Sequence, residues 1–212
     1  CHPQDPLRRV MSRNYEYIIS SLPALSRDWR FKENASFGTW LDWIKSQLDD
    51  ADKKTVDALL DGFKDENLDR GFYQAALSHG NAFIRNYFTF DLNVRNAKAR
   101  FLNKAFGRKA GEDTIDLPAG VFPEAARLEG ILATDDLLGR ERALDDLMWT
   151  KISELSLFNY FDIDAILAFL AKLHIIDRWF SLDEETGRDM FRSLVDEVRG
   201  TFKGVNYVAP KD

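Results

Sequence analysis

Histidine side chains could support catalysis or metal binding in this 212-residue chain. The chain has three of them, His2, His79 and His174. His2 lies near the beginning of the sequence, His79 lies at the end of a predicted helix, and His174 lies within an apolar helical pattern. A metal site would need several such ligands close together, so we expect no metal.

Several acidic residues occur as neighbours along the chain. Adjacent residues on a helix point about 100° apart, so these groups are more typical of a solvated surface or a first helical turn than of a general acid and base. The sequence also contains no Gly-rich phosphate loop, no GxSxG and no HExxH. We therefore predict that the protein is not an enzyme and uses no cofactor. Examples of such acidic groups are Asp49-Asp50, Asp135-Asp136, Asp145-Asp146 and Asp183-Glu184-Glu185.

Basic residues gather in one place in a chain whose formal net charge is −6. They lie between residues 81 and 108, opposite an apolar stripe, and the last three are spaced by four, which places them along one edge of a helix. We predict that this basic ridge binds a partner, for which an acidic protein surface is one candidate; a solvated surface and an RNA site are the alternatives. The ridge consists of Arg85, Arg95, Arg100, Lys104 and Arg108.

The composition excludes several classes of protein. An acidic chain is not a general nucleic-acid binder, because nonspecific phosphate affinity comes from accumulated Lys and Arg. The single cysteine, Cys1, allows no intramolecular disulfide, which favours a cytoplasmic setting. No run approaches the roughly 18 apolar residues of a transmembrane helix, so we expect contact with a membrane only through a partner.

Aromatic residues offer a second interpretation. Five tryptophans and sixteen phenylalanines could form a small-molecule pocket, with Trp149, Phe158 and Trp179 as its candidates, but their helical positions beside other core residues favour a packed core.

One helix organises the elements that must position these residues. The stretch 81–108 contains no proline and no glycine before Gly107, so it predicts a helix of about 26 residues and about 40 Å. Its apolar residues recur at spacings of three and four, so one side must be buried. This stripe is Phe83, Tyr87, Phe90, Val94, Ala97, Phe101 and Ala105, widened by Ile84, Phe88, Leu92, Leu102 and Phe106.

The remaining patterns predict an all-α fold with two subdomains, each centred on one long apolar helix. The subdomains are 11–106 and 124–200, joined by a hinge at 107–123 that contains three glycines and two prolines. Residues 1–10 read as a leader, 201–212 as a loose tail, and 14–21 as an extended segment, although one helical turn also fits. The other predicted helices are 36–48, 52–63, 69–79, 123–128, 140–155, 162–179 and 181–200.

The succession FDLNVRNAKARFLNKAFGRKAGED, followed by IDLPAGVF, resembles the C subunit of V-type and A-type ATP synthases, known as the d subunit in the eukaryotic enzyme. Asp91, Asn93, Arg95 and the Leu117-Pro118-Ala-Gly120 step occupy the corresponding places. NYEYIISSLPALS and the run from Leu144 to Phe191 are similar to a shorter bacterial family of uncharacterised proteins associated with V-type ATPase gene clusters.

This resemblance implies an all-helical, non-catalytic adaptor between the rotor stalk and the membrane-embedded ring of a V-type ATPase. Its partners would be the other subunits of the complex, and it would couple rotation to proton or sodium transport. It would be cytoplasmic and peripheral, held at the cytoplasmic face of the inner membrane through the complex. Members of the longer ATP synthase family are built from three modules, whereas this chain has room for about two.

Overall fold

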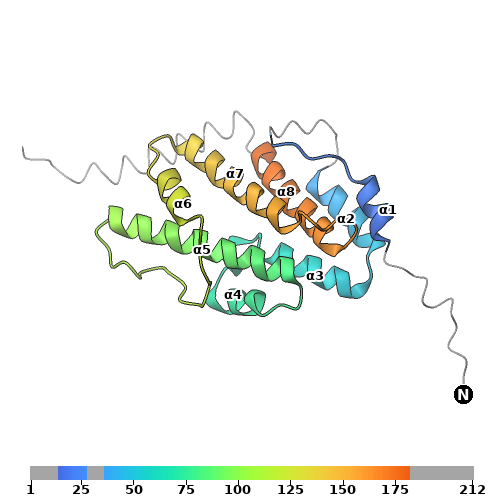
Figure 1. Cartoon of the computed structure of the whole chain (residues 1–212), viewed down its shortest axis with the longest axis horizontal. Helices are drawn as coiled ribbons and strands as arrows, with labels where there is room; N and C mark the ends of the chain where they lie inside the picture. Colours follow the sequence, from blue (N-terminus) through green and yellow to red (C-terminus); the bar gives the residue numbers. More distant parts are fainter. Residues whose placement is uncertain (1–13, 28–35, 182–212) are drawn as a thin grey trace, which may run out of the picture. The chain divides into compact units, whose positions relative to one another are not determined.

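The computed structural model describes residues 14–27 and 36–181, with side chains up to Trp179. Within these ranges the chain forms α-helices, one short 3₁₀ helix (Asp65–Asn67) and no β-strand, which confirms the predicted all-α class (Figure 1). The α-helices are α1 (Tyr15–Ser21), α2 (Phe37–Gln47), α3 (Asp50–Asp61), α4 (Arg70–Leu77), α5 (Ala82–Ala105), α6 (Ala125–Leu132), α7 (Leu137–Leu155) and α8 (Ile163–Ser181).

The first described segment corrects the prediction for residues 14–21, which form helix α1 and not an extended segment. Tyr15 and Ile18 are its buried residues, and a spacing of three places both on one side of a helix. The apparent alternation was misleading because Tyr17 is exposed, whereas a strand with that pattern would bury it with Tyr15.

Short polar side chains begin two helices at the predicted positions. The Ser36 hydroxyl accepts a hydrogen bond from the backbone N–H of Thr39 at the start of α2. The Asp162 carboxylate accepts one from the N–H of Ala165 at the start of α8, at 3.2 Å. Each side chain satisfies a backbone donor that has no partner within the helix.

Helix α5 is the central element of the described fold, as the sequence predicts. It runs unbroken for 24 residues and contacts α3, α4, α6 and α7 (Figure 1). It ends where Gly107 adopts a positive φ of 64°, a conformation that glycine adopts without steric cost. The N–H of Arg108 then donates to the carbonyl of Asn103 and closes the helix end.

The last turns of α5 differ from the prediction. Leu102 and Phe106 are 49% and 62% exposed, whereas the equivalent positions Ile84, Phe88 and Leu92 are buried. The neighbouring helices of the described part cover the first turns of α5, and its C-terminal end extends past them (Figure 1). Apolar periodicity therefore overestimates how much of this helix is buried.

Three asparagines of α5 hold the predicted hinge, residues 107–123, against the helix. Asn103 Nδ2 donates to the carbonyl of Glu112, and Asn93 Nδ2 donates to that of Ala119 at 3.0 Å. Between them, the Asn96 amide donates to the carbonyl of Ile115 and accepts from its N–H, at 2.9 and 2.8 Å. Since the partners advance along the chain as the asparagines recede along α5, the segment runs antiparallel to the helix.

Both sides of this segment contribute to one hydrophobic core. Phe90 and Val94 of α5 pack with buried leucines of α6 and α7, and Phe122 of the segment packs against them. The division into subdomains at 107–123 stays a prediction, but the segment itself lies within the first of two compact units, which ends at Ile175. The leucines are Leu128, Leu132, Leu144 and Leu147.

Helix α8 is the second long apolar helix that the sequence predicts. Ile166, Leu167 and Leu170 lie on it and are fully buried. Even so, each helix of the described residues is too short or too polar to cross a lipid bilayer. The predicted leader 1–10, the predicted helix 181–200 and the predicted tail 201–212 lie outside the described residues, apart from Ser181.

Candidate functional site

The turn between α7 and α8 carries the largest exposed apolar cluster of the described surface. Four of its five residues are exposed, with Leu157 at 59%, Phe158 at 83%, Tyr160 at 66% and Phe161 at 60%. We call residues 157–161 the aromatic turn.

Asn159, the remaining residue of the aromatic turn, holds the turn through hydrogen bonds. The Asn159 N–H donates to the carbonyl of Ser156, and the Asn159 side chain donates to Asp162, which in turn caps α8. The turn is thus held by hydrogen bonds while its large side chains face solvent. An apolar cluster of this kind is typical of a protein–protein or membrane contact.

The five cations of the basic ridge differ in their exposure and contacts. Arg95, Arg100 and Lys104 are exposed. Arg108 is exposed too, but its guanidinium lies 3.5 Å from the Asp113 carboxylate. Their role in partner binding stays a prediction.

Arg85 differs from the other residues of the basic ridge, because it binds the backbone of a neighbouring turn. Its guanidinium donates to the carbonyls of His79 and Gly80, at 2.5 and 2.8 Å, in the turn that follows α4. These carbonyls lie just beyond the helix end, where a cation is favourable. Arg85 therefore has a structural role in this turn, which spacing alone did not indicate.

Two apolar side chains are also exposed at the C-terminal end of α5. Leu102 and Phe106 lie beside Arg100 and Lys104 in the sequence and share their exposure. At about 100° per residue, these two side chains lie on the opposite side of the helix from Arg100 and Lys104. The described surface thus offers separate basic and apolar sides at this end of α5 and an apolar cluster at the aromatic turn.

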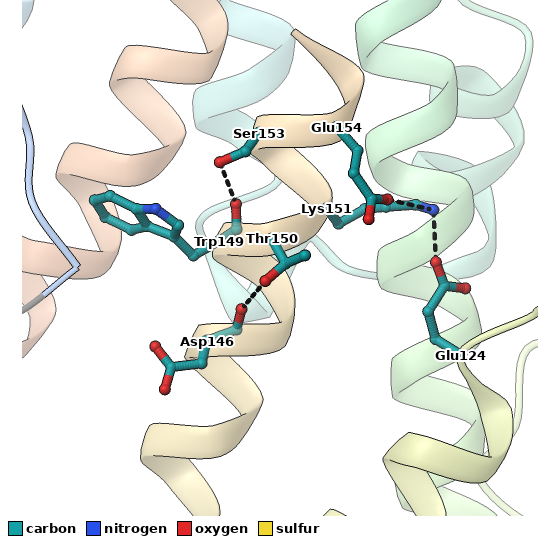
Figure 2. A network of polar contacts seen from close by, with 7 residues as sticks. All are labelled: Glu124, Asp146, Trp149, Thr150, Lys151, Ser153 and Glu154. Atoms are coloured by element: carbon teal, nitrogen blue, oxygen red, sulfur yellow. Dashed lines mark hydrogen bonds and ion pairs between the residues drawn. The ribbon is translucent and has the colours of Figure 1, made fainter. Parts of the chain in front are cut away.

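A polar network joins α7 to the start of α6 (Figure 2). The Lys151 ammonium donates to Glu124 Oε1 at 2.7 Å and to Glu154 Oε2 at 3.5 Å. It also lies 5.2 Å from the centre of the Phe90 ring. Burial lowers the pKa of Lys151, but the hydrogen bond and charge of Glu124, together with Glu154, outweigh it and raise that pKa above its ordinary value.

A small cavity adjoins this network. It has a volume of about 190 Å³ and is lined by α5, by the end of the 107–123 segment and by α7. The polar groups on its wall are Asn86, Thr89, Asn93, Glu124 and Lys151.

A second cavity of about 190 Å³ has Lys172 on its wall, beside Leu25 and Phe169. Burial, aided by the charge of Arg27, lowers the pKa of Lys172. The ammonium lies 5.3 Å from the centre of the Trp149 ring, so it makes a cation–π contact. Packing of this kind accounts for the lysine without a bound molecule.

The structure does not bring the predicted aromatic pocket together. Trp149 is only 5% exposed, whereas Phe158 is 83% exposed and so cannot line an enclosed cavity with it. Trp149 and Lys151 point to opposite sides of α7 (Figure 2). The small-molecule interpretation therefore loses one of its three candidate side chains.

The two described histidines have local partners. His79 Nδ1 accepts a hydrogen bond from the N–H of Asn81 at 3.0 Å. The His174 ring stacks on Phe63, with ring centres 4.0 Å apart. Among the described residues, no cluster of three or more His, Cys, Asp or Glu side chains could hold a metal ion.

A partly buried acid, Asp91, lies on the Asp91-Asn93-Arg95 stretch of α5. The hydroxyl of Tyr73, which is fully buried, donates to Asp91 Oδ2 at 2.5 Å. Burial raises the pKa of Asp91, and this rise is opposed by the Tyr73 hydrogen bond and by the charges of Arg95 and Lys98. The acid thus anchors α4 to α5.

Removing the hydroxyl should destabilise the protein. We expect Tyr73→Phe to lower the free energy of unfolding by about 1–3 kcal/mol at neutral pH, because a buried carboxylate loses a donor. Since the pKa of Asp91 is raised on folding, the folded state binds a proton more readily than the unfolded state. Stability should therefore fall as the pH rises from the ordinary value of 3.8 through the folded-state pKa.

Urea unfolding between pH 3 and pH 7 checks both statements. Because the Tyr73 hydrogen bond lowers the pKa of Asp91, Tyr73→Phe should extend this decline to higher pH, and Asp91→Asn should remove it. An Asp91→Asn profile parallel to that of the parent chain would show that this carboxylate does not titrate in that range.

Comparisons with known proteins add one match. Residues 108–201 match a family described as Protein of unknown function (DUF2764). No curated protein and no solved structure matches the chain. The matched residues begin after α5 and include α6, α7, the aromatic turn and α8.

Proposed function

We propose that this chain is a non-catalytic helical adaptor of a V-type ATPase, which links the rotor stalk to the membrane ring and so couples rotation to proton or sodium transport. The observation that carries an adaptor function is the aromatic turn. Four large apolar side chains are exposed within five residues, and their contact with water is unfavourable. Burial of these side chains against a partner surface would remove that cost. The assignment to a V-type ATPase is supported by the sequence resemblance.

The described polar clusters favour an adaptor over an enzyme. The partly buried acid Asp91 accepts a hydrogen bond from Tyr73, and His79 and His174 are engaged in local contacts. A nucleophile beside a base, or two acids facing one cavity, would favour catalysis. The clusters described above have neither arrangement.

Association would occur at the cytoplasmic face of the inner membrane, with the membrane reached only through the complex. The aromatic turn would supply an apolar contact, and the exposed end of α5 would supply a second contact with basic character. An acidic partner surface suits the second contact, because the remaining basic side chains there would otherwise repel one another.

Gentle co-purification tests this function. A tagged chain expressed in its native cells should retain stalk or membrane-ring subunits of the V-type ATPase, identified by mass spectrometry. Retention of none of these subunits, under conditions in which the ATPase itself stays assembled, would refute the proposal.

Reversing charge at the end of α5 should weaken this association. We expect Arg100→Glu with Lys104→Glu to lower retention at least about tenfold, because attraction to an acidic partner becomes repulsion. The melting temperature should stay nearly unchanged, since both side chains are exposed.

The matched control reverses two other exposed cations, Lys54 on α3 and Arg127 on α6, and produces the same change in net charge. It should retain the partner as the parent chain does. Equal retention by both double variants would mean that the end of α5 lies outside the interface.

A further inference from the structure

The aromatic turn is followed directly by two acids. Asp162 is the next residue along the chain and accepts a hydrogen bond from the Asn159 side chain of the turn, at 2.5 Å. Asp164 lies two residues further on, in the first turn of α8. Residues 152–171 contain no Lys, Arg or His. Along this stretch, the exposed apolar cluster is therefore accompanied by acids and by no cation.

Neutral hydrogen-bond donors hold both carboxylates. Asp162 accepts from the N–H of Ala165 and from the Asn159 amide. Asp164 accepts from the Asn81 amide at 2.5 Å. In the described part of the chain, neither carboxylate forms an ion pair. Since amides and backbone N–H groups carry no net charge, both negative charges remain beside the aromatic turn.

Cations of neighbouring elements do not cancel these two charges. Burial raises the pKa of Asp164, the Asn81 hydrogen bond opposes that rise, and the charge of Asp162 adds to it; no described cation contributes. The pKa of Lys172, the next cation along α8, is lowered by burial and by Arg27, and neither aspartate raises it. The N-terminal end of a helix dipole supplies only about half a positive charge. The flank of the aromatic turn therefore keeps a net negative charge.

On the basis of the proposed function, in which the aromatic turn is an adaptor contact, we propose that this turn binds a basic, apolar segment of a partner protein. The Lys or Arg side chains of that segment would pair with Asp162 and Asp164, and its apolar side chains would cover Phe158 and Phe161. Exposed aromatic rings favour the same partner, because their faces attract ammonium and guanidinium groups.

Lipid surfaces and nucleic acids fit this surface less well. The cytoplasmic leaflet of a membrane has a negative surface potential, and nucleic acids carry a phosphate at each nucleotide. Asp162 and Asp164 would repel both. A second copy of this chain would offer the cations of the basic ridge, and the experiment below separates that occupant from a different protein.

Titration of the ¹⁵N-labelled chain by NMR tests the proposal. The probe is a synthetic amphipathic peptide of leucine and lysine, about 14 residues long, and its control has glutamate in place of each lysine. The basic peptide should shift the amide signals of Phe158, Phe161 and Asp164 saturably, and the acidic peptide should not. Raising NaCl from about 50 to about 300 mM should weaken the binding at least about fivefold, because salt screens exposed charges.

Removal of the two negative charges should have the same effect as salt. Asp162→Asn with Asp164→Asn keeps the size and the acceptor oxygens, so we expect the affinity for the basic peptide to fall at least about fivefold. The matched control is Asp116→Asn with Asp135→Asn, which changes the net charge equally at two exposed positions and should bind as the parent chain does.

A third variant keeps the test decisive if the double aspartate variant fails to fold, as judged by its melting curve. Phe158 is 83% exposed, so Phe158→Ala should leave the melting temperature nearly unchanged. It should weaken binding of the basic peptide at least about threefold, because apolar contact and a ring face are both lost.

Four results would overturn the proposal. The first is no saturable shift at the aromatic turn with the basic peptide, and the second is equal binding of the acidic peptide. The third is a shift of these signals by vesicles of phosphatidylglycerol but not by the peptide, which would indicate a lipid surface. The fourth is a shift that depends on the concentration of the chain alone, which would indicate a second copy.

Failure of this test and failure of the proposed function are separate outcomes. The titration uses the isolated chain and a synthetic peptide, so a negative result leaves association with a V-type ATPase open to the co-purification experiment. Conversely, a chain that retains no ATPase subunit but binds the basic peptide at the aromatic turn would keep the partner chemistry and lose the assignment to that complex.

Discussion

Replacing Gly62 with alanine should lower the free energy of unfolding by about 3 kcal/mol, as expected for strong overpacking in a core. A Cβ at this position would lie 2.2 Å from Cε1 and Cζ of Phe88 and 2.8 Å from Cζ of Phe72. Phe88 is fully buried and packs edge to face against Phe72, with ring centres 4.9 Å apart. The ring cannot move aside without disturbing the contact between α4 and α5.

The φ of Gly62 is −77°, so alanine could adopt its backbone conformation and the effect is purely steric. The control is Gly130→Ala on α6, where an added Cβ meets nothing within 4 Å. That change should stabilise the chain by about 0.5–1 kcal/mol, because alanine favours a helix. Urea unfolding of both variants measures the difference, and a Gly62→Ala variant as stable as the parent would contradict the packing described.

Replacing Asn96 with leucine should lower the free energy of unfolding by about 2–4 kcal/mol. Asn96 is 6% exposed and makes two hydrogen bonds with the backbone of Ile115, at 2.9 and 2.8 Å. Leucine has a similar volume but satisfies neither group. The N–H and the carbonyl of Ile115 would both lose their partner, and the 107–123 segment would lose its central attachment to α5.

The same substitution at Asn86 is the control, since Asn86 lies on the same helix and is exposed. Asn86→Leu should change stability by no more than about 0.5 kcal/mol. Urea unfolding measures both variants, and hydrogen exchange at Ile115 should increase in Asn96→Leu alone. Equal stability of the two variants would mean that the asparagine contacts do not hold the segment.

The sequence was sufficient to predict most of the described helices, because the local signals within each segment agreed with one another. In α5, apolar spacing, the absence of proline and a glycine at the end all predict one long helix, and the structure has it. The prediction for residues 14–21 was wrong because so short a segment fits both a strand period and a helix period, and burial of Tyr15 and Ile18 agrees with the helix.

The attachment of the 107–123 segment could not be predicted from its own composition. Glycines and prolines correctly indicate that α5 must stop, but they say nothing about where the chain packs afterwards. The available signal was on α5, where Asn93, Asn96 and Asn103 interrupt a helical pattern. Asparagine is unfavourable inside a helix, and these three amides bind the backbone of the segment, whereas Asn86 on the same helix is exposed. The residue type alone therefore did not identify which asparagines bind the segment.

Candidate surfaces were predicted less completely than the fold. Spacing placed five cations on one predicted helix, but only the structure shows that Arg85 binds backbone carbonyls and that Arg108 lies beyond the end of α5 and faces Asp113. The sequence also showed Phe158, Tyr160 and Phe161 in a connecting segment without indicating their exposure. Whether such residues are buried depends on neighbours distant in the sequence, which periodicity does not describe.

Site-specific photocrosslinking in native cells tests the adaptor function most directly. A photoreactive phenylalanine, p-benzoylphenylalanine, replaces Phe158 in the aromatic turn, and the same residue at Tyr17, which is 53% exposed on α1, serves as the control. We predict covalent adducts between position 158 and a stalk or membrane-ring subunit of the V-type ATPase, and none from position 17. Adducts from position 158 that contain no subunit of that complex, or no adduct at all, would contradict the proposed function.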